Sequence, residues 1–162
     1  MLPTRYAELW ANLVADFPEV KQHPERVYLV QYYDPTHDDA GDICTFAASD
    51  ISQADWTWFH DGVLGSPGKG GLNDVLSQTA QQYGWTLVGG VADAYAQHGY
   101  CASNNWVDTL FESETLEGTR DGTGHPNEMG QAKSGDIERT YLTKLFYVGG
   151  DPTNGLDPAY KP

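Results

Sequence analysis

The residues whose types and spacing could do chemistry lie in one short segment, Asp121-Gly122-Thr123-Gly124-His125-Pro126-Asn127. His125 stands between a glycine-rich turn and a proline, and the carboxylate of Asp121 lies four residues upstream. Because the φ angle of Pro126 suits a first helical turn, His125 is expected at or next to a helix N-cap, with its imidazole projecting from the surface. An imidazole held in this way suits a general base. An ordinary surface histidine at a helix entry would show the same pattern.

A second group of polar side chains follows a strand-like segment. Residues 34–55 form a polar loop that contains Asp34, His37, Asp38, Asp39 and Asp42. A metal site is conceivable there, but the spacing fits no calcium-binding loop. We interpret the loop as a solvated acidic turn, and the sequence predicts neither a metal nor a cofactor.

The helices that must position these residues are predicted from apolar side chains at helical spacing. A first helix over residues 6–17 is ended by Pro18 and should bury one face. A short helix is expected over residues 55–65, a second amphipathic helix over residues 72–83 with Gly84 ending it, and a helical turn over residues 92–98. The final helix should start near Pro126, with these inward positions: Met129, Ile137, Tyr141 and Leu145.

Two strands are predicted between these helices. Residues 26–33 are rich in Val, Leu and Tyr without strict alternation, which indicates burial on both faces. Residues 85–91 form the next strand, and the strand, helix, strand order implies a right-handed crossover with parallel pairing. Residues 100–124 are expected to be irregular and to lead to His125. The pattern as a whole predicts an α/β fold with about two parallel strands and about four helices.

Composition limits the function classes. An apolar content of 40% over 162 residues is enough for the core of one globular domain. A net charge of −14 argues against nucleic acid or an anionic membrane as a partner. No apolar run approaches the ~20 residues of a membrane span, and no signal peptide is visible at the start of the chain.

The histidine segment resembles a known block. Gly-Thr-x-His-Pro-Asn-x-x-Gly, ending at Gly130, is similar to the last conserved block of the SGNH (GDSL-type) hydrolases. Residues 27–38 with Gly41 and Cys44, then residues 84–88 and 98–101, resemble secreted bacterial members of this family in the same order. Residues 2 to about 146 therefore look like the C-terminal half of such a domain. The resemblance implies a partial three-layer, flavodoxin-like SGNH domain over residues 1–148, with residues 149–162 as a tail or linker.

The resemblance implies an esterase or lipase that uses a Ser-His-Asp-like triad on a small-molecule, lipid or carbohydrate ester. His125 would be its base, and Asp121 is the candidate acid. The family places this acid three residues before the histidine, where Gly122 stands, so a backbone carbonyl is the alternative partner. No Gly-Asp-Ser occurs in the chain, so we expect the nucleophile to belong to a missing N-terminal half and the chain to be inactive alone.

Two further features are interpreted through the same resemblance. Gly71-Leu72-Asn73-Asp74 spells the family's oxyanion block, but it follows a glycine-rich break and enters a helix, so Asn73 is interpreted as a helix-start residue. Cys44 and Cys101 on their own could be two free thiols. In a secreted hydrolase they would pair in a disulfide, which implies a secreted or extracytoplasmic protein.

Two alternative functions stay open. With ten Tyr and five Trp, the chain could be a non-catalytic carbohydrate- or partner-binding module. An exposed, coplanar arrangement of Trp56, Trp58 and Trp106 would favour the module. An SGNH-type acyltransferase would share the histidine block.

Overall fold

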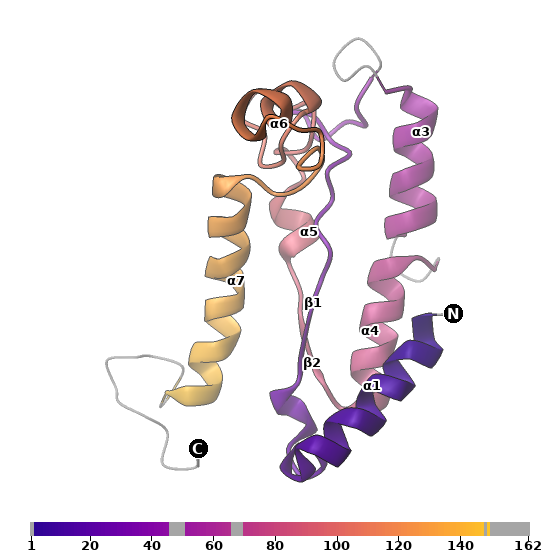
Figure 1. Cartoon of the computed structure of the whole chain (residues 1–162), viewed down its shortest axis with the longest axis vertical. Helices are drawn as coiled ribbons and strands as arrows, with labels where there is room; N and C mark the ends of the chain where they lie inside the picture. The colour runs from indigo at the N-terminus through magenta and orange to yellow at the C-terminus, as the bar shows by residue number, and fades with distance from the viewer. Residues whose placement is uncertain (1, 46–50, 66–69, 148, 150–162) are drawn as a thin grey trace.

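The computed structural model describes residues 2–45, 51–65, 70–147 and 149, and these form a mixed α/β architecture (Figure 1). Strands β1 (Tyr28–Val30) and β2 (Thr86–Val88) are parallel, with Leu29 opposite Leu87. The predicted α/β class and the parallel pairing are therefore confirmed.

The chain between the two strands forms α3 (Gln53–Trp58), η3 (Phe59–Leu64) and α4 (Leu72–Tyr83). The hydroxyl of Ser52 caps α3 by accepting the N–H of Asp55. At the other end, Gly84 stops α4 in a left-handed conformation with a φ of 71°, which glycine adopts without steric cost. The helix expected over residues 55–65 corresponds to α3 and η3, and the helix expected over residues 72–83 corresponds to α4, so both predictions are confirmed.

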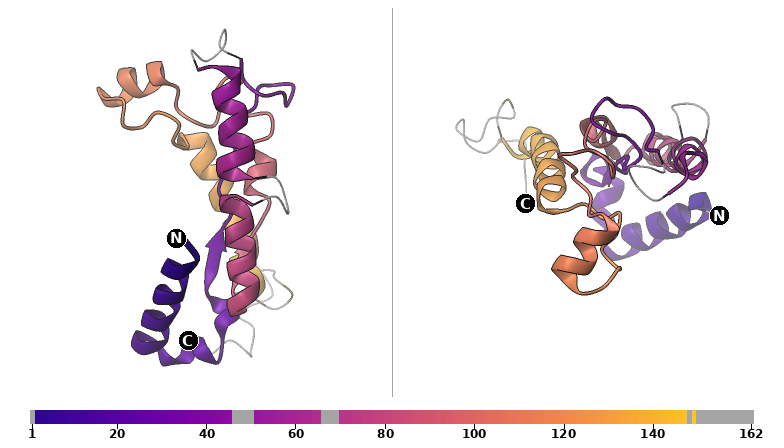
Figure 2. Two further views of the ribbon diagram at one scale, coloured as in Figure 1. Left: turned by 90° about the vertical axis from the view of Figure 1, so that its right-hand side faces the viewer. Right: turned by 90° about the horizontal axis from the view of Figure 1, so that it is seen from above.

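Helices flank the strands on two sides. Figures 1 and 2 show α4 on one side of the strands and α7 (Glu128–Phe146) on the other, which is a helix, sheet, helix arrangement. Both strands run toward the end of the molecule that carries α5 (Val91–Ala94) and α6 (Leu110–Glu117). Loops that follow the strands therefore gather at one end, where parallel sheets commonly carry their sites.

The first helix is present, but its predicted apolar face is covered less than expected. α1 (Leu2–Asp16) is followed by the short turns η1 (Pro18–Lys21) and η2 (Pro24–Arg26), and it packs against α4. Trp10 contacts the rings of Tyr83 and Trp85. None of the α1 residues is fully buried. The predicted face is therefore the right one but is only partly covered: four of its six apolar positions are half-buried (Tyr6, Trp10, Leu13 and Val14), and two are exposed (Leu9 and Phe17).

The strands are shorter and less covered than predicted. Each has three residues, and Val30 is exposed rather than buried on both faces. Within the described residues the sheet has two strands, so each strand keeps one unpaired edge. Helices cover such a narrow sheet incompletely, and this explains why Val30 is exposed.

Two predictions about the second half of the chain are corrected. Residues 100–124 were expected to be irregular but contain α6, which starts with a capping box between Thr109 and Glu112. α7 begins at Glu128, two residues after the expected start at Pro126, and its cap is Asn127. Met129 was predicted to face inward and is 57% exposed, whereas the three other predicted inward positions are half-buried: Ile137, Tyr141 and Leu145.

The core lies beyond the carboxyl ends of the strands rather than between sheet and helices. Its buried members come from the loops after both strands, from α3 and from α5: Tyr33, Cys44, Trp56, Val91, Tyr95, Tyr100, Trp106 and Val107. This core supports the loops that carry the candidate site. No described helix is both long and apolar enough to cross a membrane. The predicted tail over residues 149–162 lies outside the described residues, apart from Gly149.

Candidate functional site

The loop that carries His125 is fixed through its backbone, while the imidazole is exposed. The N–H of His125 donates to the carbonyl of Gly122 at 2.9 Å, and the N–H of Asp108 donates to the carbonyl of His125 at 2.8 Å. Val107 and Pro126 form an antiparallel bridge beside them. These contacts therefore fix the backbone that carries the imidazole and leave the ring exposed.

The start of α7 follows this loop directly. The side chain of Asn127 accepts the N–H of Gly130, so Asn127 is the N-cap. His125 lies two residues before the cap, rather than at or next to it as predicted. Its exposed ring agrees with the prediction that the imidazole projects from the surface.

His125 lines a cavity of about 310 Å³ at the carboxyl end of β1. The hydroxyl of Tyr33 donates to the carbonyl of Gly124 at 2.7 Å, which joins the segment after β1 to the histidine loop. Burial raises the pKa of Tyr33 above its usual range, so its hydroxyl stays a donor. Most other walls are apolar or aromatic: Tyr32, Pro35, Ile51, Trp56, Phe59 and Tyr100.

Two aspartates are candidate partners of the His125 imidazole. Asp121 is exposed, and its N–H lies 3.3 Å from the hydroxyl of Thr119. Within the described part of the chain, no hydrogen bond or ion pair joins Asp121 to His125, so its role stays a prediction. Burial raises the pKa of Asp108, whereas the charge on His125 favours ionisation of Asp108 and so acts to lower this pKa. Asp108 therefore lies within electrostatic range of the imidazole.

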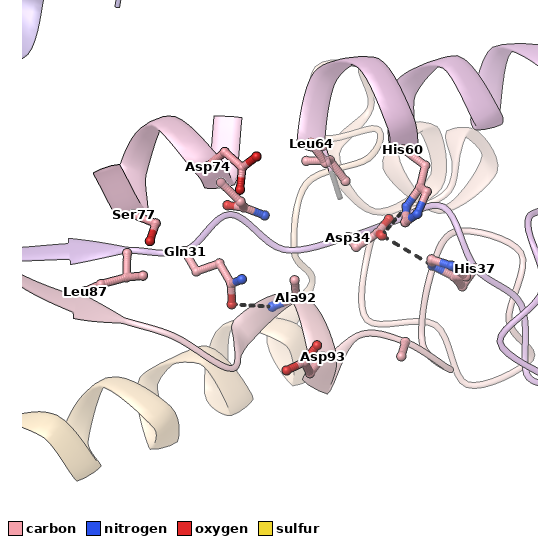
Figure 3. A pocket seen from close by; sticks show the side chains of 13 residues that line it. Gln31, Asp34, His37, His60, Leu64, Asp74, Ser77, Leu87, Ala92 and Asp93 are labelled. Atoms are coloured by element: carbon pink, nitrogen blue, oxygen red, sulfur yellow. Dashed lines mark hydrogen bonds and ion pairs between the residues drawn. The ribbon is translucent and has the colours of Figure 1, made fainter. Parts of the chain in front are cut away.

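Asp34, His37 and His60 form a second cluster (Figure 3). The Nδ1 of His60 lies 2.7 Å from Oδ2 of Asp34, and the Nδ1 of His37 lies 3.4 Å from the same oxygen. The two imidazole rings meet edge to face at 5.0 Å. One carboxylate oxygen thus faces two imidazoles from different segments of the chain.

The carboxylate of this cluster is held in its ionised form. Burial of Asp34 opposes ionisation, but hydrogen bonds from His37 and Thr36 outweigh it and lower the pKa of Asp34 to about 2. The hydrogen bond to Asp34 raises the pKa of His37, against the effect of burial. Asp34 is only 7% exposed. The predicted solvated turn is therefore wrong for this residue, because two imidazoles and a buried threonine surround it.

The cluster faces a cavity of about 370 Å³ between the segment after β1, η3, α4 and α5. Gln31 lines the same cavity and accepts the N–H of Ala92 at 3.3 Å (Figure 3). Within residues 31–35, Gln31 and Asp34 line this cavity, whereas Tyr32, Tyr33 and Pro35 line the cavity of His125. One short segment therefore separates the two cavities.

Asn73 connects α4 to this segment. Its Oδ1 accepts the N–H of Tyr32 at 2.8 Å, and its Nδ2 donates to the carbonyl of Tyr32 at 3.1 Å. Asn73 lies at the start of α4, as predicted, but the N-cap is Gly71. The side-chain amide of Asn73 thus pairs with both backbone polar groups of Tyr32, as the backbone of a neighbouring strand would.

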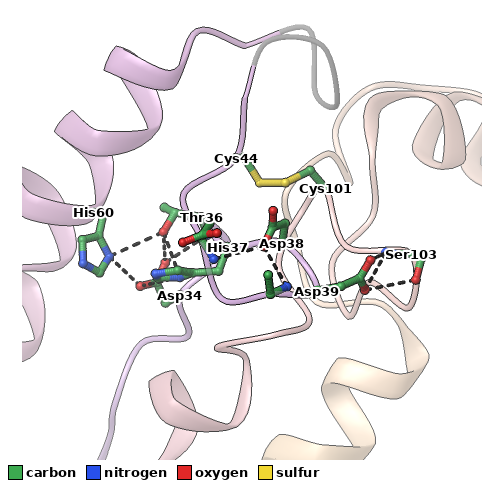
Figure 4. The surroundings of a disulfide bond; sticks show 11 residues. Asp34, Thr36, His37, Asp38, Asp39, Cys44, His60, Cys101 and Ser103 are labelled. Carbon is green, nitrogen blue, oxygen red and sulfur yellow. Dashed lines mark hydrogen bonds and ion pairs between the residues drawn. A yellow bond between two sulfur atoms is a disulfide. The ribbon is translucent and has the colours of Figure 1, made fainter.

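A disulfide joins Cys44 to Cys101, 57 positions apart (Figure 4). The carboxylate of Asp39 reinforces this link, because it accepts hydrogen bonds from the N–H and the hydroxyl of Ser103. Both contacts tie the loop after β1 to the loop after α5. The pairing that the family resemblance implied is present in the structure.

The aromatic residues do not form the arrangement that would favour a binding module. Trp56 and Trp106 are buried in the core, whereas Trp58 is 66% exposed. A flat platform of three exposed indoles is therefore absent from the described residues.

Comparison of the chain with protein-family models, with curated proteins and with solved structures gave no match. Two residues of the candidate sites were missed from sequence. His60 lies in a helical segment 26 positions after Asp34 in the sequence. Asp108 lies in a stretch that was expected to be irregular. No local signal marks either residue, although the Thr-x-x-Glu capping pattern at residues 109–112 could have placed the helix that follows Asp108.

Proposed function

We propose that this chain supplies the general base and one wall of the substrate cavity of an SGNH-type ester hydrolase. The observation that carries the proposal is the position of His125. Its imidazole is exposed, sits on a loop with a fixed backbone and borders an aromatic cavity at the carboxyl end of a parallel strand. A base must reach its proton within hydrogen-bond distance, which requires a ring that is accessible from the substrate cavity.

The cavity suits an acyl chain or an aryl group. Aromatic and aliphatic side chains form most of its walls, and binding sites for small organic molecules are lined mainly by such residues. A carboxylate near the base would stabilise the imidazolium that forms when the base takes a proton. Asp108 and Asp121 are the two candidates for this role, and Asp108 has the electrostatic connection to His125.

The nucleophile of the proposed reaction comes from a polypeptide segment outside these 162 residues. No serine lines the cavity of His125 among the described residues. Thr123 does line it, but its hydroxyl oxygen is buried. A serine brought to the open side of the cavity would give its proton to His125 while it attacks the ester carbonyl, and the base would return the proton to the leaving alcohol.

Reconstitution tests the proposal. The chain alone should not turn over p-nitrophenyl butyrate, whereas a protein that joins it to a segment with a Gly-Asp-Ser block should hydrolyse this ester. In that joined protein, His125→Ala should lower kcat by about 100-fold to 10,000-fold, the usual contribution of a general base. His23→Ala is the matched control, because His23 is an exposed histidine paired with Glu25 and should leave kcat unchanged.

Two results would contradict the proposal. Saturable hydrolysis by the chain alone would mean that it contains its own nucleophile, and a Thr123→Val variant would then show whether Thr123 supplies it. Full activity of the His125→Ala protein would remove the base assignment. Asp108→Asn and Asp121→Asn, compared in the same protein, identify the acid. An added alcohol that captures the acyl group faster than water does would identify an acyltransferase instead.

A further inference from the structure

We propose that Asp34, His37 and His60 form a binding site for one divalent metal ion of the zinc type. This site is separate from the cavity of His125 and does not depend on the proposed ester hydrolysis. It rests on the ligand set, on the hydrogen bonds that support it and on the charge of the cavity that it faces.

The three side chains provide the ligands that zinc prefers when a coordination position stays open. Two imidazoles and one carboxylate are a recurrent set for Zn²⁺ and for other divalent transition metals. One ligand atom from each residue lies within 4.8 Å of the other two. Ligand atoms on a tetrahedral zinc ion lie about 3.4 Å apart, given bonds of about 2.1 Å. Small rotations of the two rings therefore suffice to close the site.

A buried threonine orients the carboxylate as a supporting residue does in metal sites. Both the N–H and the hydroxyl of Thr36 donate to Oδ1 of Asp34, at 2.9 Å and 2.6 Å. These bonds occupy one carboxylate oxygen and direct the other, Oδ2, toward the two imidazoles. Outer residues that fix the orientation of a ligand raise metal affinity, and their loss usually costs about 10-fold to 100-fold.

The backbone around the ligands is also fixed. A Cβ atom on Gly99 would lie 2.3 Å from the carbonyl oxygen of His37, so only glycine allows this approach. The N–H of Cys44 donates to the carbonyl of Thr36, and the N–H of Tyr100 donates to the carbonyl of Pro35. The two segments that the disulfide joins, around Cys44 and Cys101, therefore fix the backbone that carries Asp34 and His37 before any ion binds.

The surroundings favour a cation. The cavity that the cluster faces is also lined by Asp74 and Asp93, and Asp61 lies 3.9 Å from Nε2 of His60. Its volume of about 370 Å³ leaves space for water or a small anionic ligand at the open position of the ion. A bound ion would join the segment after β1 to η3 and would leave one side free.

Titration of the untagged chain with ZnCl₂ tests the proposal. Calorimetry should show one bound ion per chain, and Co²⁺ in its place should give a visible absorption band that saturates at one equivalent. Zinc should also raise the Tm, because an ion that binds the folded chain in preference to the unfolded chain stabilises it.

Variants locate the ion. His60→Gln should weaken zinc binding by at least about 100-fold, and Thr36→Val should weaken it by about 10-fold to 100-fold. His60 is the better ligand variant, because its side chain is 29% exposed and its removal disturbs the core less than removal of Asp34. His23→Gln is the matched control, since it removes an exposed histidine that also pairs with a carboxylate.

Three outcomes would overturn the proposal. The first is a folded chain that binds no zinc at 100-fold molar excess. The second is a stoichiometry other than one. The third is a folded His60→Gln variant that binds zinc and Co²⁺ as the original chain does. Circular dichroism of every variant verifies the fold, and a His37→Gln variant replaces His60→Gln as the ligand test if the latter unfolds.

Discussion

The hydroxyl of Tyr33 lies 2.7 Å from the carbonyl oxygen of Gly124, although 91 positions separate the two residues. This bond attaches the histidine loop to the segment after β1. Tyr33→Phe should lower the free energy of unfolding by about 1–2 kcal/mol, because it leaves a partly buried carbonyl without its donor. Chemical denaturation measures the loss.

The same variant should free the loop locally. Hydrogen exchange at the amide of His125 should become faster in Tyr33→Phe than the global loss of stability requires. Tyr32→Phe is the control, because the Tyr32 hydroxyl makes only a 3.4 Å contact with Tyr33. Equal exchange rates in the two variants would show that the bond does not fix the loop.

The disulfide between Cys44 and Cys101 should contribute more to stability than any single hydrogen bond. It spans 57 positions, and a closed loop of that size stabilises a fold by roughly 4 kcal/mol on the chain-entropy model. Mass spectrometry of the unreduced protein should detect the bridge, and a double Cys→Ser variant should show the loss of stability. Two thiols that alkylate freely without reduction would disprove the pairing.

Asn73→Ala should destabilise the chain by about 1–3 kcal/mol, because the change removes two hydrogen bonds to the backbone of Tyr32. Asn73→Asp should have an intermediate effect, since a carboxylate still accepts the N–H of Tyr32 but cannot donate to its carbonyl. Thermal unfolding of the three proteins separates these cases. Unchanged stability of Asn73→Ala would mean that the amide contacts contribute nothing.

The capping box of α6 predicts a dependence of stability on pH. Burial of Glu112 raises its pKa, but hydrogen bonds from Thr109 and Asn105 outweigh this effect and lower it. A lowered pKa in the folded state stabilises the fold above the unfolded value of about 4.3, and this contribution is lost as pH falls through the folded pKa. Glu112→Gln should therefore be less stable than the original chain at pH 7, with a smaller difference at pH 3.

Glu138→Gln is the control for this pH series. Among the described residues the side chain of Glu138 makes no hydrogen bond or ion pair, so this variant removes a carboxylate from a helix without removing a cap. A Glu112→Gln difference that stays constant from pH 7 to pH 3 would contradict the role of the ionised carboxylate.

The helices with strong local signals could be predicted from sequence. Pro18 follows the end of α1, and Gly84 ends α4. Parallel pairing followed from the strand, helix, strand order. α6 was missed because its apolar residues lack helical spacing, although Thr109 and Glu112 carry a capping pattern. The apolar face of α1 could be predicted, but not how little of it is buried, because the amount of burial depends on what packs against a helix and periodicity does not contain that information.

The candidate sites were predicted in part. The exposed place of His125 before a helix could be predicted from its glycine and proline neighbours, although the helix cap lies two residues further on, at Asn127. The cluster of Asp34, His37 and His60 was not predicted as a unit. It forms only when η3 packs beside the segment after β1, and this contact joins residues 26 positions apart. Local patterns cannot report such a contact.

The division of residues 31–35 between two cavities has a thermodynamic consequence for ligand binding. Gln31 and Asp34 line one cavity while Tyr32, Tyr33 and Pro35 line the other, so this segment forms part of the wall of both cavities. A ligand that shifts this wall from one side changes the shape of the opposite side. Equilibrium then requires reciprocity: the factor by which the first ligand changes the affinity for a second equals the factor by which the second changes the affinity for the first.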